Sequence, residues 1–204
     1  MSVEVTDWFE PLYTAARGGE RRIPWDRGEA HPLLVGWTAA RRLRGDGRRA
    51  LVVGAGLGFD AEHVASLGFA TTAFDIAPTA VAMARERHPG SAVDYRVADL
   101  LELPAAWERA FDLVVEVMTV QALPEALRAP AIAAVAATVA PGGELLVVGA
   151  IRDGAPAPGP PWPLTRADVE AFGADGLEAD AIQRVPLPAA PGELRWRAVF
   201  SRSD

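Results

Sequence analysis

The sequence of 204 residues predicts an α/β fold: a doubly wound, mostly parallel sheet of seven strands with an antiparallel hairpin at its C-terminal edge. Apolar runs alternate with helix-forming stretches after residue 50, as in sheets covered by helices on both faces. Three alternating glycines, Gly54, Gly56 and Gly58, end the first run and introduce a helix. The last two apolar runs flank a turn at 188–192 that contains Pro and Gly, which is typical of a hairpin.

Each element follows from a local pattern. Short aliphatic runs bounded by turn residues predict five parallel strands, at 50–53, 71–74, 93–97, 111–117 and 144–150. Between them, apolar periodicity and stop signals, including the turn at 141–143, predict helices at 59–67, 79–88 and 124–139. The remaining elements are a Pro/Gly-rich stretch at 153–163, a short helix at 165–172 and two strands at 179–187 and 194–201.

The first 45 residues differ in character from the rest of the chain. Two aromatic clusters, one around Trp8 and Tyr13 and one around Trp25 and Trp37, flank an Arg- and Gly-rich stretch at 17–22. Because they stand outside the strand–helix alternation, we expect them to lie across the cleft at the sheet's edge. The predicted parts of this single domain are a lid and helix at 1–45 and a Rossmann-like core at 46–204.

The composition excludes several classes of function. The chain has no Cys, Lys or Asn, which excludes thiol catalysis, zinc thiolate sites, Schiff-base enzymes and P-loop NTPases. Its net charge of −7 opposes binding to nucleic acid. No apolar run approaches the roughly 20 residues that span a bilayer, so we predict a cytoplasmic protein without a membrane partner.

The glycine-rich turn and Asp75 predict a site for a nucleoside cofactor. Glycines between a strand and a helix place bare backbone N–H groups beside a ligand. Asp75 ends the next strand, where its carboxylate can accept both hydroxyls of a ribose. An NAD-dependent oxidoreductase shares these features, but its glycine pattern would require Gly where Phe59 stands, and no Tyr/Lys or His dyad is evident.

Four motifs in order along the chain resemble those of class I S-adenosylmethionine-dependent methyltransferases. They are the glycine loop at 52–58 (VVGAGLG), the acidic strand end at 74–75 (FD), the segment 98–100 (ADL) and the turn 141–145 (PGGEL). The resemblance covers nearly the whole chain and implies S-adenosylmethionine as cofactor, with S-adenosylhomocysteine as product. Asp75 would then bind the ribose, and Asp99 with the Leu100 N–H would bind the adenine edge.

Two further segments are similar to the thiopurine methyltransferase family. They are 23–34, with IPWDRG and HPLL, and 159–165 (GPPWPLT), which in that family lies near the substrate. The family carries Asp in its fourth strand where this chain has Glu116. The resemblance implies a small-molecule acceptor, and a thiol, a thiopurine or a halide is predicted.

The predicted site therefore has two parts. The cofactor-binding residues are Trp25, Gly54, Gly56, Gly58, Asp75, Ile76, Asp99, Leu100 and Glu116. The substrate pocket is predicted to contain Trp8, Tyr13, Met118, Arg152 and Trp162.

Several of these residues have a structural alternative. Glu116 would meet the cofactor ammonium, or would form a buried pair with an Arg. Asp99 could instead cap the following turn, and Trp25 and Trp162 could be ordinary core aromatics.

No side chain is assigned as a general base, and no metal is predicted because the three histidines lack ligand spacing. His63 and His88 are expected to face solvent, and His31 to begin a helix near the lid. A catalytically silent, methyltransferase-like binding domain is the non-enzymatic alternative. The protein would be a monomer or a homodimer.

Overall fold

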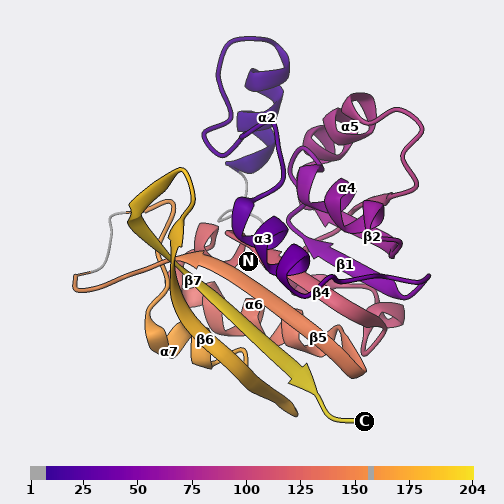
Figure 1. Ribbon diagram of the computed structural model, residues 1–204. Helices are drawn as coiled ribbons and strands as arrows, with labels where there is room; N and C mark the ends of the chain where they lie inside the picture. Colours follow the sequence, from indigo (N-terminus) through magenta and orange to yellow (C-terminus); the bar gives the residue numbers. More distant parts are fainter. Residues whose placement is uncertain (1–7, 156–158) are drawn as a thin grey trace.

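The computed structural model describes residues 8–155 and 159–204, and it contains the predicted seven-stranded mixed sheet (Figure 1). The strand order is β3-β2-β1-β4-β5-β7-β6, with β7 antiparallel to both of its neighbours. The strands are β1 (Arg49–Val53), β2 (Ala70–Asp75), β3 (Asp94–Val97), β4 (Phe111–Val117), β5 (Val139–Ala150), β6 (Leu177–Leu187) and β7 (Ala190–Arg202). The predicted fold class is confirmed.

Helices cover both faces of the sheet. Alternate residues of the central strands point to opposite faces, so Val114 of β4 belongs to one core cluster and Leu113 and Val115 to the other. The cluster of Val114 contains side chains of α6 and α7, and the second contains side chains of α3, α4 and α5. The helices are α2 (Phe9–Arg17), α3 (Pro32–Ala40), α4 (Phe59–Ser66), α5 (Pro78–Arg87), α6 (Glu125–Ala137) and α7 (Arg166–Glu170), with short 3-10 turns η1 (Leu100–Glu102), η2 (Ala105–Trp107) and η3 (Val120–Ala122).

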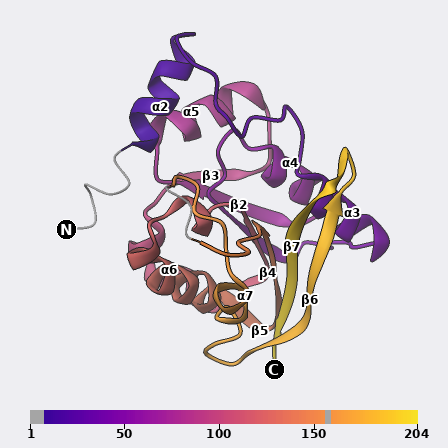
Figure 2. The same ribbon diagram turned by 90° about the vertical axis from the view of Figure 1, so that its left-hand side faces the viewer.

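The N-terminal helix α2 packs beside α5, and a third apolar cluster that includes Leu12 and Tyr13 fills the space between them (Figure 2). Glu10 fixes this position: its Oε2 accepts from the backbone N–H of Thr79 at 3.0 Å, and its Oε1 accepts from the Thr79 hydroxyl. Arg17 forms an ion pair with Glu86. A carboxylate from α2 therefore caps the first turn of α5.

Two strands are longer than their sequence patterns predict. The register between β4 and β5 shifts between Phe111 and Leu113, so that β5 begins at Val139 and includes the expected turn at 141–143. In the hairpin, β7 already begins at Ala190, because a second irregularity beside Leu187 moves the turn. Residues 1–7 of the predicted lid and 156–158 of the Pro/Gly-rich stretch lie outside the described residues.

Within the described chain, no helix is both long and apolar enough to cross a membrane.

Candidate active site

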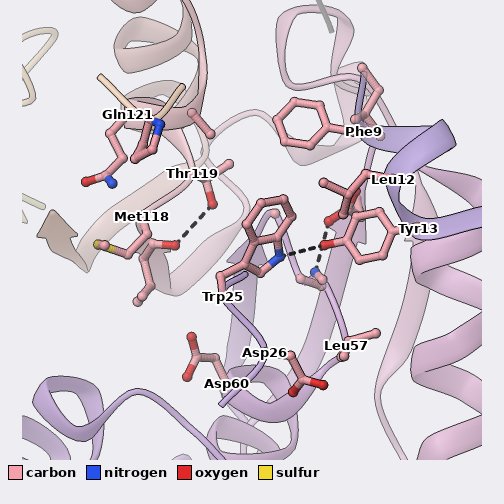
Figure 3. Close-up of a pocket in the computed structure, with 18 of the residues that line it drawn as sticks. Phe9, Leu12, Tyr13, Trp25, Asp26, Leu57, Asp60, Met118, Thr119 and Gln121 are labelled. Atoms are coloured by element: carbon pink, nitrogen blue, oxygen red, sulfur yellow. Dashed lines mark hydrogen bonds between the residues drawn. The ribbon is translucent and has the colours of Figure 1, made fainter. Parts of the chain in front are cut away.

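A cavity of about 670 Å³ lies at the carboxyl ends of β1, β2 and β4, with the N-terminal segment forming one wall (Figure 3). This is the edge of an open α/β sheet at which ligands bind. Of the predicted site residues, those that line it are Trp8, Tyr13, Trp25, Gly54, Gly56, Asp75, Ile76, Asp99, Leu100 and Met118.

Glycine is needed in this loop for more than one structural reason. All have positive φ: +64° at Gly54, +51° at Gly56 and +89° at Gly58. A Cβ on Gly56 would lie 3.2 Å from the Tyr13 hydroxyl, at the cavity wall. A Cβ on Gly58 would lie 2.3 Å from the Tyr95 hydroxyl, and Gly58 does not line the cavity. This glycine therefore lets α4 approach β3, and its cofactor contact stays a prediction.

Asp75 is 7% exposed, and both of its oxygens hold the loops around it. Oδ2 accepts from the Gly56 N–H at 2.9 Å, and Oδ1 accepts from the Ala77 N–H at 3.0 Å. Burial raises the pKa of this carboxyl above its ordinary value despite these bonds. The Ile76 backbone N–H also favours the charged form, and of the roughly four acceptor positions of a carboxylate at least one stays open to a ribose hydroxyl.

Asp99 lies on the cavity wall together with Leu100. Its Oδ1 also accepts from the Leu101 N–H at 2.8 Å and so caps η1. The capping role that the sequence left open is therefore present, and it orients the carboxylate beside the cavity.

Glu116 is 1% exposed and does not line the cavity. Its Oε1 accepts from the backbone N–H groups of Thr119 and Val120, at 2.8 and 2.9 Å. Burial raises the pKa of this carboxyl to about 7. No Arg pairs with Glu116 among the described residues, so that alternative is corrected, whereas its contact with a cofactor ammonium stays a prediction. Glu116 instead holds the backbone that follows β4.

That backbone carries Met118 in a left-handed conformation, with a φ of +62°, on the cavity wall. The Met118 N–H donates to the Val148 carbonyl at 2.8 Å, and the Thr119 hydroxyl donates to the Val53 carbonyl at 2.9 Å. A residue other than Gly in this conformation needs surrounding contacts to hold it, and these bonds supply them.

Four rings of the N-terminal segment form an aromatic wall of the cavity: Trp8, Phe9, Tyr13 and Trp25. The Trp25 ring lies edge-on to each of the others, with centroid distances of 5.9 Å to Trp8, 6.4 Å to Phe9 and 6.0 Å to Tyr13. Its Nε1 donates to the Tyr13 hydroxyl at 3.0 Å (Figure 3). Trp25 is still 41% exposed, so it is not a core aromatic.

Arg152 and Trp162, predicted in the substrate pocket, do not line this cavity. The Arg152 guanidinium lies 3.5 Å from the Glu125 carboxylate. The backbone N–H of Trp162 donates to the backbone carbonyl of Gln121 at 2.7 Å. Buried Arg128 donates to the Trp162 carbonyl at 3.0 Å and holds this loop in place. The loop presents Pro160 and Pro161 to the cavity instead.

His31 lines the cavity and begins α3, as expected. Its Nδ1 accepts from the Leu33 N–H at 3.2 Å, so the ring proton lies on Nε2. Burial, followed by the charges of Arg27 and Arg195, lowers the pKa of His31 to about 4. A neutral ring whose basic nitrogen is occupied cannot act as a base.

The other two histidines are partly exposed, and each also makes a polar contact within the fold. The His63 Nε2 lies 2.9 Å from the Thr38 hydroxyl, and the His88 Nε2 lies 3.1 Å from the Leu57 carbonyl. Each imidazole connects a helix to a neighbouring segment, a contact that the helix position alone did not indicate.

Asp60 is a cavity residue that the sequence analysis missed. It lies in the first turn of α4, and its Oδ1 accepts from the His31 N–H at 2.6 Å. Burial raises its pKa, while the His31 N–H and the charge of Arg27 oppose this rise. Its place after the glycine loop was the available signal. Within the described residues, no group of His, Asp and Glu side chains is arranged to hold a metal.

Comparison with known proteins finds a family match over part of the chain. Residues 50–143 match the family model described as "Methyltransferase domain". Ubiquinone biosynthesis O-methyltransferases are similar: that of Xanthomonas axonopodis pv. citri (strain 306) is 35% identical over 119 residues, 57% of this chain and 48% of the relative. That of Azotobacter vinelandii is 35% identical over 130 residues, 59% of this chain and 55% of the relative. The chain thus spans about half the length of these curated relatives.

Solved structures share the fold. The 1,6-didemethyltoxoflavin-N1-methyltransferase of Burkholderia thailandensis, with bound S-adenosylhomocysteine, has a TM-score of 0.72 at 21% identity, covering 100% of this chain and 88% of its own. A TehB-like methyltransferase from Corynebacterium glutamicum has a TM-score of 0.64 at 20% identity, covering 100% of both chains. Residues 50–143 thus match a methyltransferase domain, and the chain shares its fold with S-adenosylmethionine-dependent methyltransferases.

Proposed function

We propose that this chain transfers a methyl group from S-adenosylmethionine to a small-molecule acceptor. The observation that carries the proposal is one cavity lined by the glycine loop, by Asp75 and by an excess of acidic side chains. Among the described residues, five acidic side chains and two basic side chains line the cavity. The acidic ones are Asp26, Glu29, Asp60, Asp75 and Asp99, and the basic ones are Arg21 and Arg27.

This charge balance separates the two cofactor classes that share the glycine loop. S-adenosylmethionine carries an ammonium, a sulfonium and one carboxylate and is positive overall, whereas NAD carries two pyrophosphate charges and a nicotinamide cation and is negative overall. An acidic cavity favours the first and opposes the second. The residues present therefore fit S-adenosylmethionine, with Asp75 toward the ribose and Asp99 and Leu100 toward the adenine.

When bound, S-adenosylmethionine supplies a methyl group on a positive sulfur that leaves as a neutral thioether. The chain's part is to align the acceptor and to exclude water, which can lower a barrier by roughly 7–11 kcal/mol in favourable cases. We propose that the N-terminal segment is the lid that does so, because its aromatic wall already lines the cavity.

The acceptor is proposed to be a thiol, a thiopurine or a halide. The His31 imidazole is neutral and its Nδ1 is occupied, and Glu116 lies outside the cavity, so neither can take a proton from the acceptor. Nucleophiles that arrive deprotonated suit such a site. The resemblance to thiopurine methyltransferases agrees, because Trp25 and Pro160–Pro161, from its two segments, line the cavity.

A hydroxyl acceptor is the second candidate, because the matched relatives are named O-methyltransferases. Asp60 is the group that such an acceptor would use as its base, since it lines the cavity and burial raises its pKa. Replacement of Asp60 by Asn would then abolish methylation of a phenol, whereas methylation of a thiolate would persist.

Two experiments test the proposal. Calorimetry should detect binding of S-adenosylmethionine and S-adenosylhomocysteine but not of NAD; the reverse order of affinity would refute it. Labelled S-adenosylmethionine is then incubated with thiols, thiopurines, halides and phenols. Transfer to the first three supports the finer proposal, and transfer to phenols alone selects the second candidate. Binding without transfer to any acceptor would identify a silent binding domain.

A further inference from the structure

Gln121 is a polar side chain that lines the cavity although the residue is only 2% exposed. Its Oε1 accepts from the Ala150 N–H at 2.6 Å. A backbone N–H can only donate, so the amide atom that faces β5 is the oxygen, and this fixes the direction of the amide. Among residues 8–155 and 159–204, no group accepts from its Nε2. Two N–H donors therefore remain for a ligand.

The backbone of Gln121 is held as firmly as its side chain. Its carbonyl accepts from the Trp162 N–H at 2.7 Å, in the loop whose Pro160 and Pro161 line the cavity. Gln121 lies within η3, directly after the Thr119 and Val120 N–H groups that bond to Glu116. A buried amide that is held at both ends presents its free donors in a fixed direction.

This amide lies away from the residues proposed to bind the nucleoside. In the sheet, β1 and β4 stand between β2, which ends at Asp75, and β5, which holds the amide through Ala150. Asp99 follows β3, which lies one strand farther out. Figure 3 shows Gln121 across the cavity from Tyr13. The free donors are therefore on the side that is left for the acceptor.

The cavity residues near this amide are mostly apolar. They are Met118, Ala122 and Leu123 of the segment after β4, and Pro160 and Pro161 of the loop. One neutral donor in an apolar wall fixes the orientation of a small ligand. It pairs with a lone pair, such as that of a carbonyl oxygen or a ring nitrogen, and it offers nothing to an ammonium, which only donates.

We infer that Gln121 determines acceptor specificity: its Nε2 donates to a carbonyl oxygen or a ring nitrogen of the acceptor. This inference rests on the proposed function and narrows it to acceptors that carry such a lone pair besides the atom that is methylated. Thiopurines have it in their rings, whereas a halide or a simple thiol does not. An acceptor without it would leave the amide N–H groups unpaired against apolar surface, which selects against that acceptor.

The test is the ratio of kcat/KM for pyrimidine-2-thiol to that for thiophenol, at a pH at which both are thiolates. Only the first has ring nitrogens beside its sulfur. In Gln121→Glu an oxygen replaces Nε2, while the other oxygen still accepts from the Ala150 N–H. The ratio should fall by about five- to fiftyfold relative to the unmodified protein. The added negative charge repels both thiolates alike, so its effect cancels in the ratio.

The matched control is Gln183→Glu on β6, an exposed residue outside the cavity whose Oε1 accepts from Arg197 at 2.9 Å. It should leave the ratio unchanged. Gln121→Met removes both polar groups without adding charge, and it should lower the ratio as Gln121→Glu does. Calorimetry with S-adenosylhomocysteine, which should bind both Gln121 variants as it binds the unmodified protein, shows that the fold is kept.

Three results would overturn the inference. A ratio within about twofold of the unmodified value in both Gln121 variants would show that the amide does not meet the acceptor. Weaker binding of S-adenosylhomocysteine with an unchanged ratio would assign the amide to the cofactor instead. If the unmodified protein binds neither S-adenosylmethionine nor S-adenosylhomocysteine, the proposed function fails and this inference fails with it.

Discussion

Replacement of Asp75 by Asn separates the carboxylate's contribution to cofactor binding from its contribution to the fold. Oδ2 accepts from the Gly56 N–H and Oδ1 from the Ala77 N–H, and the carboxylate keeps acceptor positions for a ligand. An amide keeps one oxygen only, so one ribose hydroxyl loses its acceptor. A hydrogen bond to a charged group is worth about 1.5–3 kcal/mol, so the affinity for S-adenosylhomocysteine should fall by about tenfold to more than a hundredfold.

The stability of the free protein should change much less. Burial raises the pKa of Asp75, so the ionised form is already costly in the fold, and a neutral amide removes this cost. That gain offsets the loop hydrogen bond that the amide nitrogen cannot accept, a loss of about 1–3 kcal/mol. Calorimetry gives the affinity, and thermal unfolding without ligand gives the stability.

The matched control is Asp94→Asn on neighbouring β3, whose carboxylate is 50% exposed and pairs with Arg96 at 2.8 Å outside the cavity. It should change neither quantity appreciably. An affinity of Asp75→Asn within about twofold of the unmodified protein would show that the free acceptor positions do not meet the ligand.

Three further substitutions test other parts of the structure. Burial raises the pKa of Glu116 from 4.5 to about 7, so its contribution to stability is full below pH 4.5 and is lost as the pH rises toward 7. Glu116→Gln should therefore make the melting temperature less dependent on pH over this range, and an unchanged pH profile would contradict this. Gly58→Ala should destabilise more than Gly90→Ala, because both glycines have positive φ but only the first meets a side chain, Tyr95; equal losses in denaturant unfolding would refute the packing argument. Glu10→Ala removes the contact by which α2 caps α5, so it should lower the free energy of unfolding by about 1 kcal/mol and speed amide exchange in α2. Unchanged exchange in α2 would show that this contact does not hold α2 in place.

The fold was largely predictable because its signals are local. Aliphatic runs, glycine turns and proline stops specify the strands and helices, and the turn near Ala189 specifies the hairpin. The early start of β5 at Val139 was not predictable, because it depends on an irregular register with β4 that no local pattern encodes.

The site was predictable where the backbone alone sets it. Asp75 and Asp99 end or follow strands, so their position at the ligand edge follows from strand direction. Glu116 is also near a strand end, but the turn after it takes up its carboxylate, which the sequence does not reveal. The pairing of Arg152 with Glu125 was not predictable either, because it depends on contacts between segments distant in the chain.

Two helix N-termini connect the N-terminal segment to the cofactor loops. Glu10 caps the first turn of α5, the helix that follows Asp75 in the chain. Asp60 lies in the first turn of α4, just after the glycine loop, and its carboxylate accepts from the His31 N–H. Carboxylates are favoured at helix N-termini, where backbone N–H groups are unpaired. The two strand-to-helix turns that approach the cofactor are therefore also the points that position the aromatic wall. A change in the turn after β2 would then move the wall and the Asp75 carboxylate together, because Asp75 and Glu10 bond to the same short stretch of backbone.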